Sequence, residues 1–518
     1  MVDEINQSID IVIPWMNDVD ENETEDEKII HIGGYKTNGR SLYLIKRRND
    51  IDFIRKQFAE KNHLLLKTFN TYAYYSCDIT EMQHKVLQHM INTGAYSFIM
   101  EFNYTNQYNI EEEYLNIMDK RITFILNNLL NNQSITLLQR KKMKANLNGR
   151  RLNSLHFLPN TRKENVPFHP VTNCRHGLTM KISRFLTHLL QPIYDRATHL
   201  KTFNTSADVI DAVEEYNKKG FLQSKTLFVN LYIHDLCTIF PYEPTVEALQ
   251  RFLHKYIIDG RIQGILIQSI IDLVRLFLEN QYILYENKLY QQIRGSSFNS
   301  PLTTLLANIY IYDWQQELVA NLDKKNEIYG RCFDEIFFTW NESKDKFNDL
   351  LNTINRPYPD MKMAININDN INYLDVNISH IDGNLKFQVA HDLNTDPYSL
   401  PYVFGHQSHD YSTLPRAVLI RAIQCYAIVS DFANELEDIQ LSFQYNRFEK
   451  NFFKNKFERF LKEFNATELN KIHYGEAYYD QSAYDSLRRN VFNYNQGLKK
   501  AKIKRCQRQT IQYRWPRS

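Results

Sequence analysis

The 518-residue sequence predicts an α+β protein, because two different periodicities recur along the chain. Runs rich in aromatic and β-branched residues, of which 226–236 is the clearest, are bounded by turn residues and predict strands. Segments such as 115–130 carry apolar residues at helical spacing and predict amphipathic helices with a buried face. With 43% apolar residues, a chain of this length can fill more than one core, and we expect about two to four subdomains.

The composition also restricts the compartment and the kind of partner. Six scattered cysteines without a Cys-x-x-Cys pair argue against a zinc site or disulfide framework and indicate a reducing compartment. Residues 1–10 lack the apolar core of a secretory signal, and polar side chains interrupt the most apolar run, 265–278. We therefore expect an intracellular protein, nuclear or cytoplasmic, with no membrane partner. Because the net charge is only +2, a nucleic-acid surface requires local clustering of basic residues.

Turns and caps predict the N-terminal elements. Residues 18–27 are dense in Asp and Glu and predict a solvated acidic segment, with an acidic interaction arm as the alternative. Residues 30–34 and 41–45 predict two strands, and residues 50–61 predict a helix with an Asp cap. We expect these elements to belong to an α/β extension over residues 30–150.

Residues 155–171 predict a basic hairpin, because prolines flank a tip that contains Arg162 and Lys163. Such a tip can hold a triphosphate or a template strand by charge, although an ordinary solvated loop is the simpler interpretation. Residues 179–190 then predict an amphipathic helix that ends at Pro192.

The middle of the chain predicts a buried strand followed by helices and hairpins. Two helices are expected at 244–256 and 263–279, a hairpin at 282–290, and a loop at 291–300 that leads into a helix with Pro301 in its first turn. Further along we expect a helix at 344–354, a pair of strands around 373–378 and 385–389, and an amphipathic helix at 446–461.

Two adjacent acids, Asp334 and Glu335, lie in the strand-like segment 331–340. Neighbouring residues on a strand point to opposite faces, so the two carboxylates can share one site only at a tight hairpin tip. Burying a carboxylate without a partner is unfavourable, and a bound metal ion is one common compensation. A polar turn between two core strands is the alternative.

After Asp485 the sequence contains no acidic residue, and basic residues are interleaved with aromatic ones. Basic side chains bind phosphates and aromatic rings stack on bases, so we expect a nucleic-acid contact here, with a solvated tail as the alternative. The candidate residues are Lys499, Lys500, Lys504, Arg505, Arg508 and Trp515.

Taken in order, these motifs resemble the reverse transcriptase family, most closely the kind carried by Penelope-like retroelements. Residues 292–308 resemble its "QIRGTAMGSPLSPLLANL" loop and helix, and residues 331–337 resemble its "RYVDDIF" hairpin. Residues 228–241 resemble "SFDVKSLYTNIP", residues 158–171 resemble "LPKIHKPG…RPIV", and residues 373–376 resemble "FLDV". The similarity covers roughly residues 30–460.

The resemblance implies a right-hand polymerase of fingers, palm and thumb, with a helical N-terminal extension and a basic C-terminal tail. It places fingers and palm in residues 151–395 and a thumb-like helical region in residues 396–470. An acidic tail (1–29) and a basic aromatic tail (471–518) flank these parts.

The implied activity is RNA-directed DNA synthesis on an RNA template and a DNA primer, with Mg²⁺ or Mn²⁺ ions held by three carboxylates. Asp334 and Glu335 match the two hairpin carboxylates, as catalytic residues and metal ligands. The positions that match the nucleotide-binding part of the family site are Arg162, Lys163, Arg294 and Gly295.

Several positions depart from the family pattern. Tyr232 stands where the strand carboxylate is expected, and Asp235 replaces that carboxylate only if the strand register shifts. Asn299 replaces a glycine, His169 an arginine and Asn160 a lysine of the family motifs. We therefore expect a pseudoenzyme that binds nucleic acid and has lost, or strongly reduced, polymerase activity. The alternative is an active RNA-directed DNA polymerase with an altered carboxylate set.

Overall fold

The computed structural model describes most of the chain between residues 60 and 509. The described residues are 29–32, 35–38, 53, 56–58, 60–69, 74–103, 107–145, 149–161, 163, 165–391, 408–445, 448, 450–469 and 480–509. The expected acidic tail, apart from its last residue, and the strand at 41–45 lie outside these ranges. Half of the helix expected at 50–61 also lies outside, while residues 53, 56–58 and 60 are helical. The first described strands, β1 (Ile29–Ile32) and β2 (Tyr35–Asn38), form an antiparallel pair.

A four-stranded antiparallel sheet, the central sheet, carries the acidic pair of the sequence. Its order is β13 (Tyr329–Cys332), β14 (Glu335–Trp340), β8 (Leu227–Ile233) and β15 (Met363–Asn368). The two faces of this sheet pack against different cores. Val229, Leu231 and Ile233 of β8 point into the largest core, whereas Phe228 points into a second one. This alternation is the expected period of two for a strand.

Helices cover the first of these faces. The longest of them is α12 (Pro301–Lys324), which begins with Pro301 in its first turn, as predicted. It packs against four other helices, which are α7 (Met180–Thr198), α9 (Leu236–Ile239), α10 (Tyr242–Tyr256) and α13 (Lys344–Asn355). Helix α11 (Ile267–Glu279) packs against α7 and α10.

The second face packs against α8 (Ser206–Lys218) and a small three-stranded sheet. That sheet contains β16 (Asn370–Tyr373), β17 (Val376–Ile381) and β18 (Asn384–Val389). The predicted pair of strands in this region is therefore confirmed, with one further strand at its edge.

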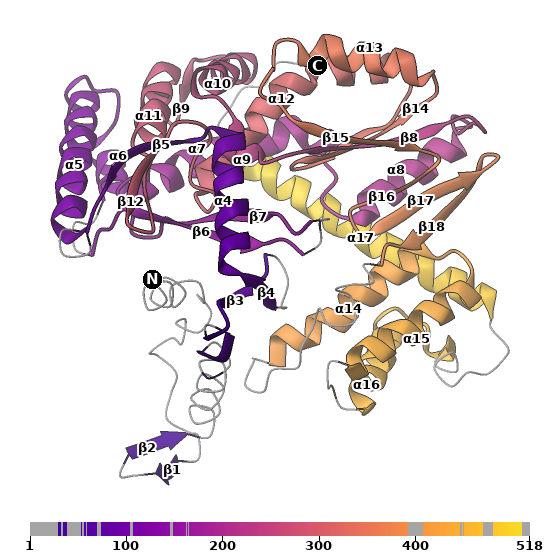
Figure 1. The fold of residues 1–518 in the computed structure, drawn as a ribbon. Helices are drawn as coiled ribbons and strands as arrows, with labels where there is room; N and C mark the ends of the chain where they lie inside the picture. Colours follow the sequence, from indigo (N-terminus) through magenta and orange to yellow (C-terminus); the bar gives the residue numbers. More distant parts are fainter. Residues whose placement is uncertain are drawn as a thin grey trace.

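A five-stranded sheet, the side sheet, lies beside the central sheet (Figure 1). Its order is β5 (Tyr96–Glu101), β12 (Lys288–Gln292), β11 (Tyr282–Tyr285), β6 (Asn153–Pro159) and β7 (Phe168–Asn173). The predicted hairpins 282–290 and 155–171 are both present in it. Because β5 pairs with β12, the N-terminal region supplies an edge strand of this sheet.

The remaining N-terminal elements surround the side sheet. They are β3 (His63–Lys67), β4 (Tyr74–Asp78), α4 (Ile79–Thr93), α5 (Gln107–Asn131) and α6 (Leu137–Met143). Helix α5 confirms the amphipathic segment 115–130. Two short strands, β9 (Arg261–Ile262) and β10 (Ile265–Leu266), precede α11, so this helix begins four residues later than predicted.

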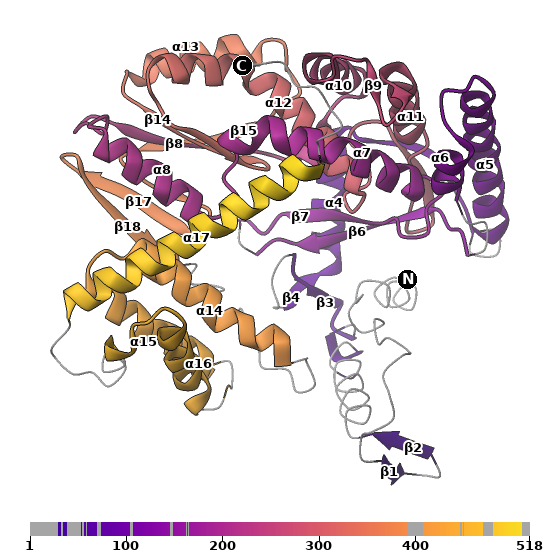
Figure 2. The same cartoon turned by 180° about the vertical axis from the view of Figure 1, so that it is seen from behind.

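The C-terminal helices form a separate core below the central sheet in Figure 1. They are α14 (Ser408–Cys425), α15 (Val429–Tyr445), α16 (Lys450–Glu463) and α17 (Gln481–Gln509). Tyr484, Leu487 and Val491 of α17 are buried in this core, so the helical region continues beyond residue 470. Figure 2 shows α17, in yellow, running across the back of the molecule toward α7, which it contacts.

One predicted helix end is wrong. Helix α7 does not end at Pro192 but continues through it to Thr198. Ile193 and Tyr194 are buried on the same face as Leu186 and Leu189, so tertiary packing compensates for the missing backbone hydrogen bond. Over the described residues, no helix is both long and apolar enough to cross a membrane.

Candidate active site

The acidic pair lies at the tip of a tight hairpin, as predicted. Cys332 pairs with Glu335 at the ends of β13 and β14, and only Phe333 and Asp334 lie between the two strands. Phe333 has a positive φ of 53°, which a two-residue hairpin turn requires. The carbonyl oxygen of Asp334 accepts a hydrogen bond of 2.9 Å from the backbone N–H of Ile233, so the turn is fixed against the end of β8. We call residues 333–335 the acidic turn.

A buried arginine supports this turn from behind. Arg331 is only 5% exposed, and its guanidinium donates to the carbonyl of Phe333 at 2.6 Å, to the Asn308 side chain at 2.8 Å and to Gln315 at 3.0 Å. A further hydrogen bond joins it to the Tyr194 hydroxyl. This network links β13, α12 and α7 directly beneath the acidic turn. Sequence reasoning missed it, although a charged residue inside a predicted core strand is a usable signal.

Burial dominates the electrostatics of the acidic turn. It raises the pKa of Asp334 to about 6, with the neighbouring charge of Glu335 acting in the same direction and Lys163 and Arg331 opposing it. The pKa of Glu335 is also raised by burial, although the backbone N–H of Leu374 hydrogen-bonds to its carboxylate. Leu374 lies in the turn between β16 and β17, so Glu335 is tied to a structural element as well as to the candidate site.

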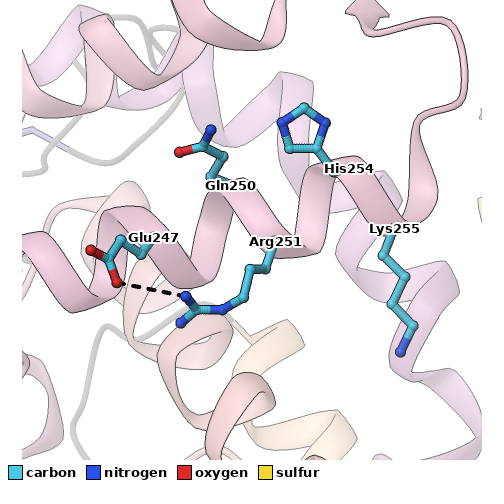
Figure 3. A pocket seen from close by; sticks show the side chains of 5 residues that line it. All are labelled: Glu247, Gln250, Arg251, His254 and Lys255. Atoms are coloured by element: carbon cyan, nitrogen blue, oxygen red, sulfur yellow. Dashed lines mark ion pairs between the residues drawn. The ribbon is translucent and has the colours of Figure 1, made fainter.

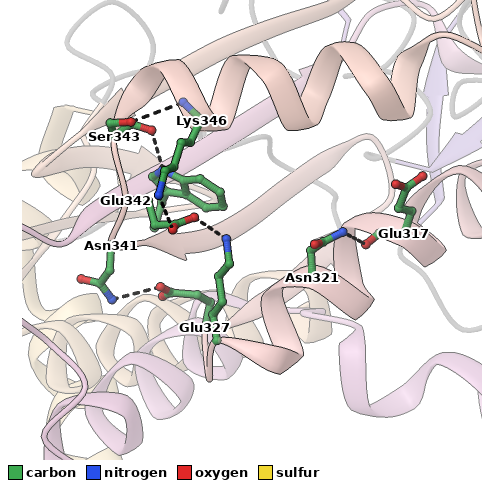
Figure 4. Close-up of polar contacts among 9 residues, drawn as sticks. Glu317, Asn321, Glu327, Asn341, Glu342, Ser343 and Lys346 are labelled. Atoms are coloured by element: carbon green, nitrogen blue, oxygen red, sulfur yellow. Dashed lines mark hydrogen bonds and ion pairs between the residues drawn. The ribbon is translucent and has the colours of Figure 1, made fainter.

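A second buried carboxylate, that of Glu327, has hydrogen-bond donors for both of its oxygens. Glu327 accepts hydrogen bonds from Tyr216 at 2.8 Å and from Thr339 at 2.6 Å. It accepts a third hydrogen bond, of 3.0 Å, from Asn341 (Figure 4). Glu327 is therefore a structural residue, whereas the described residues give Asp334 no comparable set of donors. This difference keeps Asp334 as the stronger functional candidate.

Tyr232 takes the place beside the acidic turn where the family resemblance expects a third carboxylate. It pairs in register with Glu335 across β8 and β14, so the two side chains lie on the same face of the central sheet. Burial raises the pKa of the phenol, and the negative charges of Asp334, Asp235 and Glu335 raise it further, together with a hydrogen bond to Asp334. Tyr232 is therefore a neutral hydrogen-bond donor to the acidic turn.

The basic tip reaches the same place from the side sheet. We use this name for residues 160–167, which join β6 to β7; Arg162 and Glu164 lie outside the described residues. The ammonium nitrogen of Lys163 lies 3.5 Å from the centre of the Tyr232 ring, which is a close cation–π contact. Burial lowers the pKa of this lysine, while Asp334, Asp235 and Glu335 oppose the shift. The tip therefore delivers a positive charge to the acidic turn.

Asp235 lies two residues beyond the end of β8, in a left-handed conformation with φ of 50°. One of its carboxylate oxygens lies 3.9 Å from Nδ1 of His89, which belongs to α4. Burial lowers the pKa of His89, and Asp235 partly offsets this. Although Asp235 is close enough to influence both Lys163 and Tyr232, it starts the short helix α9 and does not take the strand position of Tyr232.

The side chains present do not fit a two-metal polymerase centre. Two divalent ions require several hard oxygen ligands, which the family supplies with three carboxylates. Here a phenol ring with an ammonium on its face takes the third position. Within the part of the chain that the structure describes, no group of three or more His, Cys, Asp and Glu side chains is arranged to hold a metal ion.

The predicted loop residues Arg294 and Gly295 have local partners. Arg294 forms an ion pair of 2.5 Å with Asp360. Gly295 has φ of 58°, and a Cβ atom at this position would lie 2.1 Å from the carbonyl oxygen of Cys237. Its N–H also donates to the carbonyl of Phe240 at 2.8 Å. The glycine thus permits close contact between this loop and α9, next to the acidic turn.

The three other departures from the family pattern have structural partners. His169 packs its ring against Phe69 and Phe298 at centroid distances of 3.9 and 4.7 Å, and burial lowers its pKa to about 4. The amide of Asn299 donates to the carbonyl of Thr172 at 3.0 Å, which joins the loop to β7. The N–H of Asn160 donates to the carbonyl of Pro167 at 2.8 Å and closes the basic tip.

The basic C-terminal candidates are placed only in part. Lys499, Lys500, Lys504, Arg505 and Arg508 lie on the second half of α17, where the backbone is described but the side chains are not. Trp515 lies outside the described residues. In the first half of the same helix, Arg488 donates to the carbonyls of Ile423 and Gln424 at the end of α14 and therefore has a structural role.

Two surface depressions lie away from the acidic turn. One is on the outer face of α10, where Glu247, Arg251 and Lys255 line it and the first two form an ion pair of 3.6 Å (Figure 3). The other lies between α8 and α17, with acidic residues from α8 and Arg488 and Arg489 from α17. Neither is lined by Asp334 or Glu335.

Comparisons with known proteins give distant structural likenesses only. No family model and no curated protein matches the sequence. A telomerase from Candida albicans in complex with a telomeric RNA fragment is 9% identical, with 83% of this chain and 70% of that chain covered and a TM-score of 0.49. Apo telomerase from Candida tropicalis is 10% identical, with 89% and 76% covered and a TM-score of 0.42.

The third likeness is to the RNA-dependent RNA polymerase of a human picorbirnavirus, which is 11% identical. The alignment covers 91% of this chain and 94% of that chain, with a TM-score of 0.43. Because every TM-score is below 0.5, we base no functional conclusion on these likenesses. The functional proposal depends instead on the sequence motifs and on the geometry around the acidic turn.

Proposed function

We propose that this chain is a reverse transcriptase-fold protein of the Penelope-like retroelement kind that binds nucleic acid. In this assignment the central sheet is the palm, the side sheet forms the fingers, and the C-terminal helices form the thumb. RNA-directed DNA polymerase activity is lost or strongly reduced.

The observation that carries the proposal is the strand register at Tyr232. The pairing of Tyr232 with Glu335, next to Asp334, brings together the same three positions that supply carboxylates in the family. The backbone is therefore suited to a site of three carboxylates, but Tyr232 does not supply one of them. Loss of a single preorganised charge-stabilising group typically lowers a rate by about 10²–10³.

The second half of α17 supports binding of nucleic acid. It has six basic residues in the ten helical positions 499–508. Phosphate contacts by such residues do not require a metal ion, because the charge is supplied by the protein. An RNA template, with or without a DNA primer, is the expected class of ligand.

Fluorescence anisotropy with labelled RNA and with a labelled primer–template tests the binding function. We expect both ligands to bind at low salt with equal affinity in Mg²⁺ and in EDTA, because the acidic turn does not recruit metal. Absence of binding at low salt would refute nucleic-acid binding. Binding that requires Mg²⁺ would contradict the metal-independent mode.

A further inference from the structure

We propose that Lys163 and Tyr232 form an internal latch, in which the lysine ammonium takes the place of a divalent cation and holds the basic tip closed on the acidic turn. The inference rests on the proposed function only in its assignment of Asp334 and Glu335 as the former metal-binding pair. It assigns to Lys163 a role within the protein in place of contact with a triphosphate.

The geometry of the tip favours this closed arrangement. The ends of the tip are joined by the hydrogen bond from Asn160 to Pro167, and Asn165 and Val166 both have positive φ values of 59° and 41°. Val166 is β-branched, so this conformation is strained and must be held by its surroundings.

A second lysine holds this strained part of the tip. The ammonium of Lys85, on α4, donates to the carbonyl of Asn165 at 2.7 Å and to that of Val166 at 3.2 Å. The carbonyls of the bent backbone are therefore fixed to α4, while Lys163 on the other side of the tip points toward the central sheet.

The charges around Lys163 show why it is retained there. Three carboxylates, those of Asp334, Asp235 and Glu335, act on its ammonium. Among the ion pairs of the described residues, none joins Lys163 to a carboxylate within 4.0 Å, and the ammonium instead rests on the Tyr232 ring, whose hydroxyl interacts with Asp334. The phenol thus connects the cation to the carboxylate, and the positive charge lowers the cost of burying the acidic turn.

The consequence is that metal binding and tip closure compete. Removing the lysine charge leaves the buried carboxylates without their cation, and a divalent ion then becomes a favourable replacement.

Titration with Mn²⁺, followed by loss of the EPR signal of the free ion, tests the latch on the full chain. We expect the wild type to show no site tighter than about 1 mM, and Lys163→Met to bind one Mn²⁺ about tenfold or more tightly than this. Adding Asp334→Asn to Lys163→Met should abolish that site, and Lys163→Arg, which keeps a cation, should behave as the wild type. Tight Mn²⁺ binding by the wild type, or no gain in Lys163→Met, would overturn the proposal.

A labelling measurement on the wild type keeps the test independent of how the variants fold. Lysine acetylation followed by mass spectrometry should modify Lys163 about tenfold more slowly than the exposed Lys141, since the latched ammonium is covered by the ring and its charged neighbours. Equal rates would overturn the latch. Neither measurement contains nucleic acid, so the latch and the proposed binding function can fail separately.

Discussion

Burial raises the pKa of the Asp334 carboxylate, and neighbouring donors and cations offset this only in part. The carboxylate has the adjacent charge of Glu335 beside it and receives partial compensation from Lys163, Arg331 and its own backbone N–H. A pKa raised to about 6 means that the folded protein binds a proton more tightly than the unfolded chain does between about pH 4 and 6. The stability that this residue contributes is therefore present at low pH and is lost as the pH rises through 6.

Replacing Asp334 with Asn should stabilise the protein at pH 7. The change removes a buried charge and keeps an oxygen that can accept the Tyr232 hydrogen bond, so we expect a gain of about 1–3 kcal/mol in the free energy of unfolding. Urea unfolding at pH 7 and at pH 4 measures the gain, which should shrink at the lower pH. The exposed Glu113→Gln is the matched control and should have little effect at either pH. A loss of stability at pH 7 in Asp334→Asn would contradict the proposed burial cost.

The residues of the site differ in how far the sequence alone could predict them. The hairpin at Asp334 and Glu335 was predictable, because a two-residue turn is set by local sequence. The catalytic and metal-binding roles of these residues stay predictions. The supporting contacts of Arg331 were not predicted, and neither was the contact of Lys163 with Tyr232. Their partners come from distant parts of the chain, and only tertiary packing brings them together.

Among the elements, the loop between β12 and α12 is determined by packing against α9. Sequence similarity associates this loop with nucleotide binding, whereas the structure also gives its residues partners within the protein. Arg294 pairs with Asp360, Asn299 reaches β7, and Gly295 lies against the backbone of Cys237. The loop therefore stabilises the junction of the two sheets whether or not it contacts a ligand.

The Gly295→Ala substitution should destabilise the protein strongly. A Cβ atom there meets the Cys237 carbonyl oxygen at 2.1 Å, and φ is positive, so we expect a loss of about 3 kcal/mol or more in the free energy of unfolding. Gly264→Ala is the matched control, because its φ is 83° but no atom lies within 4 Å of the added Cβ. The control should lose only about 1 kcal/mol. Equal losses in urea unfolding would show that contact with α9 is unimportant.

The elements themselves were mostly predictable where local signals are strong. Proline at the start of α12, the hairpins of the side sheet and the apolar face of α5 all follow from sequence. Helix α7 was ended too early, because the burial of Ile193 and Tyr194 outweighs the local penalty of Pro192. The residues after 480 were expected to form a tail, but Tyr484 and Leu487 place the first half of α17 in the C-terminal core.

At the scale of the whole molecule, α17 joins the C-terminal helices to the back of the central sheet. Its first half is held by the buried core, and its second half carries the basic residues toward α7 (Figure 2). The basic residues therefore lie on the continuation of a helix whose first half is packed in a core.

Replacing Lys499, Lys500, Lys504, Arg505 and Arg508 together with Gln should weaken RNA binding and flatten its salt dependence. If all five contact phosphates of a single strand, the slope of log K against log salt should fall by about 3 to 4. The control replaces Lys141, Lys142 and Lys144, which are exposed on or next to α6, and should leave the slope unchanged. An unaltered slope in the five-residue variant would remove α17 from the binding surface.

We propose that the arrangement of a polymerase is kept while its chemistry is lost at Tyr232. The most direct test is primer extension on an RNA template, with Mg²⁺ or Mn²⁺, at a protein concentration at which anisotropy shows that the primer–template is bound. We expect at most weak extension by the wild type, since the acidic turn has two carboxylates and a lysine in the place of the metal. Robust extension by the wild type that Asp334→Asn abolishes would contradict the loss of polymerase chemistry.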